Sequence, residues 1–306
     1  MKVFLARRLL GLISVLLGVI TIVFLIIHLV PGDPARIMLG ENALPSDVEA
    51  LRESLGLNRP LIVQYFDFFA KLFQGDLGRS FNTGQPVLNA IIERFPATLI
   101  LTAASMFFAV IIAVPIGIIT AAKRNTVVDN LGMIFSLIGV SMPAFWLGPI
   151  LILIFSVKLG ILPVSGSGSI KHLVLPSFSL GFALAAIISR MTRASMIEVL
   201  NQDYIRTARA IGVSEKIILL KHALRNAIIP VVTIVGLQFG ALLGGVIIIE
   251  IIFSWPGIGQ LLIPAIMRRD YPLVQGCILF IAVVYIFVNL IVDIIYAYID
   301  PRIKYS

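Results

Sequence analysis

The chain alternates between long apolar runs and short polar segments. Most of the apolar runs hold about 20 residues, the length that a helix needs to cross a bilayer. The runs lie near Leu9–Val30, Thr98–Ala122, Leu131–Val157, Leu173–Ile188, Ala227–Phe253 and Val274–Ile299. The fourth run is short, and we expect its helix to extend towards Met191. The pattern therefore predicts an all-α membrane protein with six transmembrane helices.

A polar region separates the first two runs and predicts a small helical insertion. Proline and glycine at positions 31, 32 and 34 end the first helix. Ser46 with Glu49 three residues later forms a capping-box pattern, and Gly56 ends the helix that follows. Pro60 opens another helix with one apolar stripe. Contact with a delivering protein and simple packing on the membrane face both remain open as its role.

A second polar region, residues 198–226, lies between two apolar runs and cannot sit in hydrocarbon. We expect a short helix over Tyr204–Ile211, with Asp203 as its cap and Gly212 as its stop, and a second helix near Ser214. The first helix would place three residues on one side, Tyr204, Ala208 and Ile211. A protruding helix of this kind can lie in a groove of another protein.

These regions divide the chain into three predicted segments. They are an N-terminal transmembrane helix (1–30), an extracytoplasmic helical insertion (31–97) and a five-helix core (98–306) that contains the polar loop 194–226. The first apolar run is longer than the apolar part of a secretory signal, and PGDP follows it in place of a small-residue cleavage site. We therefore expect this helix to remain in the protein.

Composition supports the membrane class. The chain is 59% hydrophobic and 13% charged, with a mean hydropathy of +1.03, whereas soluble proteins carry about 25% charged residues. With the N-terminus inside, the inner segments hold 14 basic and 5 acidic residues, and the outer segments hold 10 and 9. This asymmetry follows the positive-inside rule. It predicts cytoplasmic termini and a cytoplasmic polar loop. It also indicates that the net charge of +8 reflects orientation in the membrane rather than binding to nucleic acid.

The sequence gives little support for an enzyme or for a metal site. The sequence contains no GxxxxGK[ST] motif, so any ATP that drives transport must be bound by a partner. The single cysteine, Cys277, lies inside an apolar run and forms neither an internal disulfide nor a metal cluster. We expect no catalytic residue, no cofactor and no metal in this chain.

Two features inside the apolar runs are candidates for a translocation pathway. Ser141, Met142 and Pro143 interrupt the third run, and broken helices are common where transporters form their pathway. The alternative is an ordinary kink. Glu250 is a carboxylate near a helix end, where such residues usually face protein or water. It is a candidate to meet substrate or a gate, or else a solvated helix-end residue.

Three glycines in the fifth run, Gly236, Gly240 and Gly244, are spaced four residues apart. They form one smooth face that permits another helix to approach closely. We expect a packing role, with a helix of this chain or of a partner permease.

Several phrases of the sequence together resemble one known family. The polar loop is similar to the cytoplasmic coupling loop of permease subunits in ATP-driven, binding-protein-dependent (ABC) importers, whose signature is Glu-Ala-Ala, three residues, Gly, nine residues, then Ile-x-Leu-Pro. Gly212 and Ala208 match that signature, as does Leu224. The departures are Arg206, Thr207, His222 and Arg225.

Those departures resemble the branch that imports dipeptides, oligopeptides, glutathione or nickel, and most closely its dipeptide and glutathione first permeases. The shared phrases are DYIRTARA-x-G, HALRNA-x-x-PVVT, PGDPAR, GDLG, FSWPGIG and RRDYP. They extend over nearly all 306 residues, and in this order and spacing they are very specific.

The resemblance implies a type I importer permease fold in a bacterial or archaeal cytoplasmic membrane. It implies four kinds of partner: a homologous second permease, two ATP-binding subunits that hold ATP and Mg, an extracytoplasmic substrate-binding protein and the lipid bilayer. The residues that would contact the ATPase are Asp203, Tyr204, Arg206, Thr207, Ala208, Arg209, Ala210 and Gly212.

The implied function is the import of dipeptides or oligopeptides by alternating access. Glutathione is a competing candidate for the substrate. A nickel or metal-chelate importer is the alternative. A self-sufficient ion-coupled carrier or channel is the hypothesis from a different class, and it would need acidic or histidine residues along the midplane of the membrane.

Overall fold

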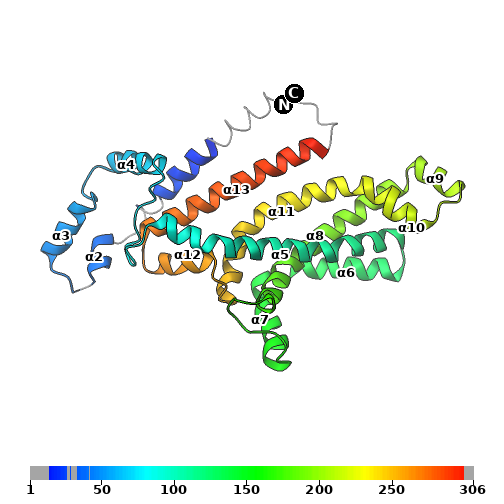
Figure 1. Cartoon of the computed structure of the whole chain (residues 1–306), viewed down its shortest axis with the longest axis horizontal. Coiled ribbons are helices and arrows are strands. Elements are labelled where there is room, and N and C mark those ends of the chain that lie inside the picture. Colours follow the sequence, from blue (N-terminus) through cyan, green and yellow to red (C-terminus); the bar gives the residue numbers. More distant parts are fainter. Residues whose placement is uncertain (1–13, 26–27, 29–32, 41, 300–306) are drawn as a thin grey trace. The chain divides into compact units, whose positions relative to one another are not determined.

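The computed structural model describes residues 14–25, 28, 33–40 and 42–299, and the regular elements within these ranges are helices (Figure 1). Their β pairing is limited to an isolated bridge between Arg79 and Pro86. Four helices are long and apolar enough to cross a membrane: Val87–Ala122, Ile170–Leu200, Glu215–Ile252 and Tyr271–Val292. A bent pair of helices makes a fifth if it is one span. The all-α membrane class is confirmed.

The count of six transmembrane helices stays a prediction. The first apolar run forms a helix over Ser14–Leu25, which is shorter than a span, and the rest of the predicted run, apart from His28, lies outside the described residues. The two termini, whose location the sequence predicts, also lie outside them.

The chain forms two compact units. One contains the described residues up to Pro96 together with Gly257–Ile286, and the other contains Ala97–Pro256 and the residues from Phe287 onward. The helices α5 (Val87–Ala122) and α13 (Tyr271–Ile299) contribute to both. The predicted segments 1–30, 31–97 and 98–306 describe which parts of the chain lie in or outside the membrane. The division into two compact units does not test that prediction.

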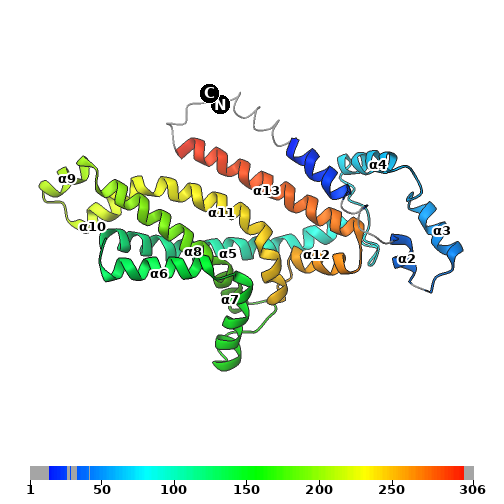
Figure 2. The ribbon, with the colours of Figure 1, turned by 180° about the vertical axis from the view of Figure 1, so that it is seen from behind.

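In the larger unit, α5, α6 (Val127–Ser141), α8 (Ile170–Leu200) and α11 (Leu224–Ile252) run alongside one another (Figures 1 and 2). Within the most apolar part of α8, 61% of the residues are buried, against 28–33% for the other candidate spans, so α8 is the central helix. Its neighbours supply an apolar core that includes Leu101, Ala109, Leu151, Val231, Val246 and Ile249.

The central position of α8 explains why its apolar run is short in the sequence. A helix surrounded by protein can carry small hydroxyl residues, because each hydroxyl bonds to the carbonyl one turn earlier. Ser179 donates in this way to the carbonyl oxygen of Leu175, and Thr192 to that of Ile188, both at 2.8 Å. The helix continues well past Met191, to Leu200.

The third apolar run is broken where the sequence predicts an interruption, because the chain turns by 102° between α6 and the pair formed by α7 (Ala144–Leu151) and η1 (Ile152–Lys158). Met142 is extended, with φ −93° and ψ 113°, and Pro143 follows with ψ 136°. Proline disfavours a helical conformation in the residue before it. The bend is therefore a complete break of the helix and not an ordinary kink.

The smaller unit contains α2 (Pro34–Leu39), α3 (Pro45–Ser54) and α4 (Leu61–Phe73). The predicted capping box is wrong, because the N-cap of α3 is Leu44 and Ser46 lies inside the helix. Pro45, at the first helical position, starts α3 with its fixed φ.

A cluster of ion pairs and rings connects the helices of this unit. Arg52 of α3 contacts Asp33 at 2.9 Å, and the hydrogen bond between them raises the pKa of the Arg52 guanidinium. Tyr65 of α4 packs edge-on against Phe24, with 5.3 Å between ring centroids, and its hydroxyl lies 2.9 Å from that of Thr21.

Asp270 joins the loop between α12 (Ile258–Met267) and α13 to a distant turn of the same unit. Its carboxylate accepts hydrogen bonds from the Ser80 hydroxyl and from the backbone amides of Phe81 and Asn82, and it is buried, with 1% exposed. A buried carboxylate is stable only when such donors surround it. Asp270 therefore fixes the turn that follows the GDLG phrase.

Candidate functional site

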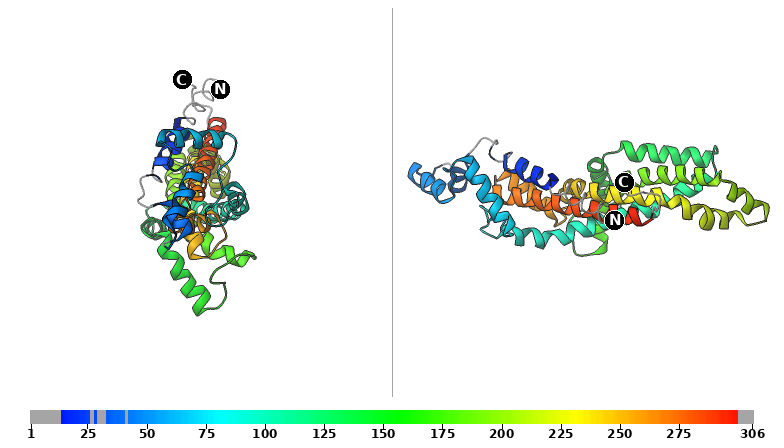
Figure 3. Two further views of the ribbon diagram at one scale, coloured as in Figure 1. Left: turned by 90° about the vertical axis from the view of Figure 1, so that its left-hand side faces the viewer. Right: turned by 90° about the horizontal axis from the view of Figure 1, so that it is seen from above.

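The polar loop forms the short helix α9, Asp203–Ala210, which extends beyond the ends of α8 and α11 (Figure 3). The helix follows α8 after the two residues Asn201 and Gln202. Gln202 is the N-cap, so the prediction that Asp203 caps the helix is wrong. Asp203 lies in the first turn, where its negative charge complements the helix dipole.

Gly212 ends α9 as predicted. Its φ of +83° is a left-handed conformation that glycine adopts without strain. The amide of Val213 then donates to the carbonyl oxygen of Ala208 at 3.1 Å, which satisfies a free carbonyl at the helix end. Ser214 is the N-cap of the next helix, α10 (Glu215–Ile217), as expected.

The buried side of α9 consists of Ile205 (0% exposed) and Ala208 (8%). The expected grouping of Tyr204, Ala208 and Ile211 on one docking side is wrong, because Ala208 is buried against the bundle whereas Tyr204 is 43% and Ile211 75% exposed. The cluster that receives the buried side comes from α5, α8, η2 (Ile218–Ala223) and α11 and contains Ile118, Ala121, Met196, Ile218, Ala223 and Ala227. Apolar contacts on one side thus hold α9 to the bundle.

The opposite side of α9 is exposed and carries charge. Arg206 is only weakly paired with Asp203, at 3.6 Å with side chains 73% and 96% exposed. Arg209 forms a two-pronged pair with Glu215, at 2.7 Å and 3.4 Å. Thr207, Ala210 and Gly212 are exposed as well. These residues form a mixed-charge surface that we call the α9 surface: Asp203, Arg206, Thr207, Arg209, Ala210 and Gly212.

Tyr204 connects α9 to the start of α11. The side-chain amide of Asn226 donates to the Tyr204 hydroxyl at 2.7 Å, and that hydroxyl lies 3.5 Å from the carbonyl oxygen of His222 in η2. Tyr204 is 43% exposed, so part of its ring remains on the surface. The hydrogen bonds of the Tyr204 hydroxyl therefore position α9 relative to α11.

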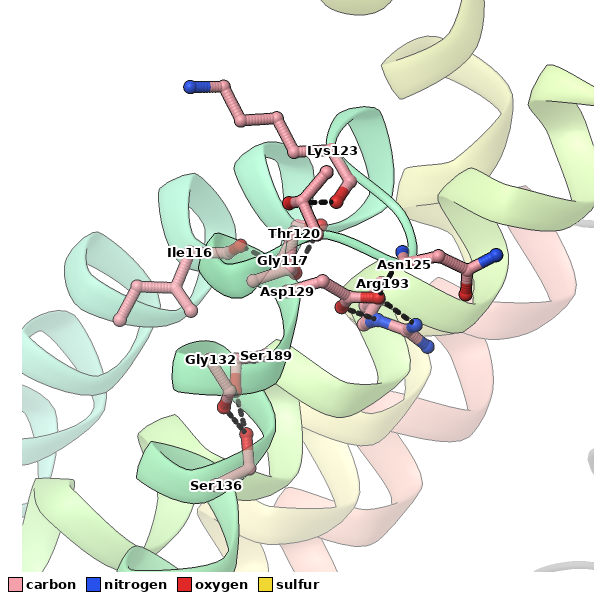
Figure 4. Close-up of polar contacts among 11 residues, drawn as sticks. Ile116, Gly117, Thr120, Lys123, Asn125, Asp129, Gly132, Ser136, Ser189 and Arg193 are labelled. Carbon is pink, nitrogen blue, oxygen red and sulfur yellow. Dashed lines mark hydrogen bonds and ion pairs between the residues drawn. The ribbon is translucent and has the colours of Figure 1, made fainter.

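In the half of α8 that leads to α9, an ion pair with a buried carboxylate joins α6 to α8 (Figure 4). The Nε of Arg193 donates to one oxygen of Asp129 at 2.6 Å, and its terminal nitrogen donates to the other at 2.7 Å. Asp129 is 1% exposed, and its second oxygen also accepts from the amide of Asn125 at 3.0 Å. Such a two-pronged pair fixes both direction and distance.

The contact between α6 and α8 continues towards the break. The hydroxyls of Ser136 and Ser189 lie 3.0 Å apart (Figure 4). One turn further, a Cβ on Gly139 would stand 2.6 Å from the Cβ of Ala186, so the two helices approach to the limit that glycine allows. We call the contacts Asp129–Arg193, Ser136–Ser189 and Gly139–Ala186 the α6–α8 seam.

The seam and the anchor at Asp270 are not among the sequence-based candidates. The opposite charges of Asp129 and Arg193, each next to an apolar run, could have indicated an ion pair, because charges at membrane helices are usually paired. Their separation of 64 residues gives no indication of which charge pairs with which.

The pathway candidates lie in two separate places. Ser141 and Pro143 are exposed and Met142 is partly buried at the break between α6 and α7. Glu250 is fully buried in α11, and the hydroxyl of Thr98 in α5 donates to it at 2.6 Å. In this conformation the carboxyl group of Glu250 is held between helices, and a pathway role stays a prediction.

The three glycines of α11 differ in their surroundings. A Cβ on Gly236 would stand 2.5 Å from Val292 of α13, and Gly240 is buried. A Cβ on Gly244 would have no atom within 4 Å. The described residues contain no group of three or more His, Cys, Asp or Glu side chains placed to hold a metal ion.

In the larger unit, several apolar helices around a central one, with the short charged helix α9 at one end, define the class of polytopic membrane proteins. Comparison with family models gives the particular family. Residues 113–305 match the binding-protein-dependent transport system inner membrane component, and residues 1–102 match the N-terminal part of the membrane component of such systems. The chain belongs to this family and is a permease of an ABC transporter.

Characterised relatives agree with this assignment. The chain is 50% identical over 300 residues to the Glutathione transport system permease protein GsiC of Pectobacterium atrosepticum and to the protein of the same name of Escherichia coli K12. Each alignment covers 98% of both chains. These relatives are permease subunits rather than enzymes.

Solved structures share the fold. A chain of the MetNI methionine ABC transporter in an inward-facing conformation matches with a TM-score of 0.57 at 19% identity, over 69% of this chain and 96% of the other. A chain of an amino acid ABC transporter matches with a TM-score of 0.52 at 16% identity, over 71% and 95%. The likeness covers nearly the whole of those shorter chains.

Proposed function

We propose that this permease imports glutathione or short peptides. The observation that supports this substrate class is the 50% identity, over 98% of both chains, to permeases named for glutathione transport. Short peptides and glutathione are both small molecules with amide bonds and charged ends, which makes them one class of substrate.

The proposed arrangement has six transmembrane helices, cytoplasmic termini and an extracytoplasmic insertion at residues 31–97, in the cytoplasmic membrane of a bacterium or archaeon. The excess of basic residues in the inner segments supports this orientation. In this orientation α9 lies in the cytoplasm, where ATP is available.

The proposed partners are a homologous second permease, two ATP-binding subunits that hold ATP and Mg, and an extracytoplasmic substrate-binding protein. The α9 surface is the proposed docking site for an ATP-binding subunit. It is supported by the exposure of the charged side of α9, whereas Ile205 and Ala208 hold the opposite side to the bundle. A helix fixed on one side and charged on the other suits insertion into a groove.

Transport would proceed by alternating access. Closure of the ATP-binding subunits would displace α9, and the free energy of nucleotide binding would shift the balance between inward-open and outward-open states. The break at Met142–Pro143 and Glu250 are the proposed pathway residues. Both are places where apolar helices are interrupted or carry a polar group.

The first test measures uptake by the complete complex in proteoliposomes, with ATP inside and the binding protein outside. We expect ATP-dependent uptake of glutathione or of short peptides. If the complex takes up nickel chelates but neither glutathione nor short peptides, the proposed substrate class is wrong. Uptake by the purified permease without ATP-binding subunits would overturn the proposed mechanism and favour a self-sufficient carrier.

The second test compares Gly212→Asp with Gly212→Asn. Both residues tolerate a positive φ, so the pair differs mainly in one negative charge on the α9 surface. We expect the aspartate variant to insert normally and to lower uptake per ATP hydrolysed by about tenfold, with little change for the asparagine variant. Equal uptake by the two variants would remove Gly212 from the docking site.

A further inference from the structure

The end of α8 is connected directly to the α9 surface. The helix α8 ends at Leu200 and α9 begins at Asp203, so only two residues separate them. Met196 of α8 also packs in the cluster that holds Ile205 and Ala208. A displacement of α9 therefore reaches the adjoining end of α8, as well as η2 and α11, which share this cluster.

At that end, α8 is fixed to α6 by Asp129 and Arg193. Both oxygens of the carboxylate accept from the guanidinium, and the carboxylate is 1% exposed while the guanidinium side chain is 24% exposed. Two parallel hydrogen bonds between a guanidinium and a buried carboxylate resist both sliding and rotation. The backbone amide of Asn125 donates a further hydrogen bond to Asp129 and ties in the turn between α5 and α6.

The rest of the seam leaves no room for slippage. Ser136 and Ser189 meet at 3.0 Å, and Gly139 lies against Ala186 with no space for an added carbon atom. Close-packed helices change position in steps rather than continuously, because a small shift already produces clashes. The two helices are thus built to keep one register.

The far end of α6 is the break at Met142 and Pro143. We propose that α6 and α8 move as one rigid body during transport, with Asp129 and Arg193 as positioning residues that pass a displacement of α9 to this break. The proposal rests on the proposed function of α9 and adds the route by which its movement reaches a pathway candidate. In this arrangement the chain hinges at the break and not within the seam.

A disulfide across the seam tests rigidity directly. In a Cys277→Ala background, Ser136→Cys and Ser189→Cys place two thiols where the hydroxyls are 3.0 Å apart, a separation from which a disulfide forms with small adjustments. We expect the oxidised complex to keep its uptake per ATP within about twofold of the reduced complex. Loss of uptake on oxidation that a reductant reverses would overturn the proposal.

The ion pair is tested with Asp129→Asn, which keeps the shape and removes the charge. We expect uptake per ATP to fall by about tenfold while ATP hydrolysis persists, and we expect the oxidised disulfide to restore it. Asp67→Asn, which removes a carboxylate from an exposed pair with Arg59 at 2.9 Å, is the matched control and should leave uptake unchanged.

The outcomes separate the two proposals. Normal coupling in Asp129→Asn overturns the role of the ion pair, and if that variant does not accumulate in the membrane, the disulfide result with Asp129 intact decides the question. A wild-type complex without ATP-dependent uptake would instead contradict the proposed function. A purely stabilising ion pair would lower thermal stability without changing uptake per ATP, and the disulfide would then restore stability alone.

Discussion

The hydroxyl of Thr98 donates a 2.6 Å hydrogen bond to Oε1 of Glu250, and both side chains are buried. Thr98 lies in α5 and Glu250 near the end of α11, so the bond joins two helices of the larger unit. Next to this bond, the indole nitrogen of Trp255 donates to the carbonyl oxygen of Ala97 at 2.8 Å. These two bonds hold the end of α11 and the residues after it against the interior of α5.

Removal of this donor tests its contribution to stability. We expect Thr98→Val to lower the free energy of unfolding by about 1.5–3 kcal/mol, because a buried carboxyl group loses a hydrogen bond. Thr98→Ser keeps the hydroxyl and loses a methyl group, at about 1 kcal/mol. Thermal unfolding of the purified protein in detergent compares the two. Equal melting temperatures for both variants would show that the bond contributes little.

The positive φ of Gly212 predicts a selective response to substitution. A valine there must adopt a left-handed conformation, which costs about 1–2 kcal/mol or more, whereas asparagine tolerates it. The space around the position is open, so a clash is not the cause. We expect faster hydrogen exchange at the amide of Val213 in Gly212→Val than in Gly212→Asn. Equal exchange in the two variants would indicate that the turn adapts without strain.

Asp270 should control the order of the turn at Ser80–Asn82. Asp270→Ala removes the acceptor of the Ser80 hydroxyl and of two backbone amides, and each lost bond to a charged group contributes about 1.5–3 kcal/mol. We expect proteases to cut this turn much faster in the variant. Asp67→Ala, which breaks an exposed ion pair, is the control and should change the cleavage rate little. Unchanged cleavage in Asp270→Ala would mean that other contacts hold the turn.

The glycines predict opposite effects of one substitution. Gly181→Ala places a carbon 2.7 Å from the carbonyl oxygen of Ser105, a backbone atom that cannot move aside, so we expect a loss of about 1–3 kcal/mol. Gly244→Ala meets open space, and the better helix propensity of alanine should stabilise the isolated chain by about 0.5–1 kcal/mol. Melting temperatures of the purified chain measure both.

Gly244 also tests for a partner helix. If another permease packs on this face, Gly244→Ala should reduce co-purification of that permease although the chain itself is more stable. Full recovery of the partner with Gly244→Ala would indicate that the face meets lipid instead.

Local features of the chain were predicted well from the sequence. Apolar runs identified helices such as α5 and α11, since a membrane requires each span to satisfy its own backbone. The sequence located the end of α9 at Gly212 and the start of α10 at Ser214. Both are local features, because the left-handed φ of Gly212 and the N-cap at Ser214 depend only on residues nearby in the chain. The capping box at Ser46 failed because Pro45 starts the helix, which moves the N-cap two residues earlier, to Leu44.

The sequence by itself determined the class of protein, the approximate spans and the position of the projecting helix α9. Only the tertiary structure decided that Arg193 pairs with Asp129, that Thr98 meets Glu250, and that Ile205 rather than Ile211 is buried. Periodicity places a residue on a face of its own helix, but the neighbour of that face depends on how distant helices pack. Pairing across 64 or 152 residues is therefore fixed by the packing of the whole bundle.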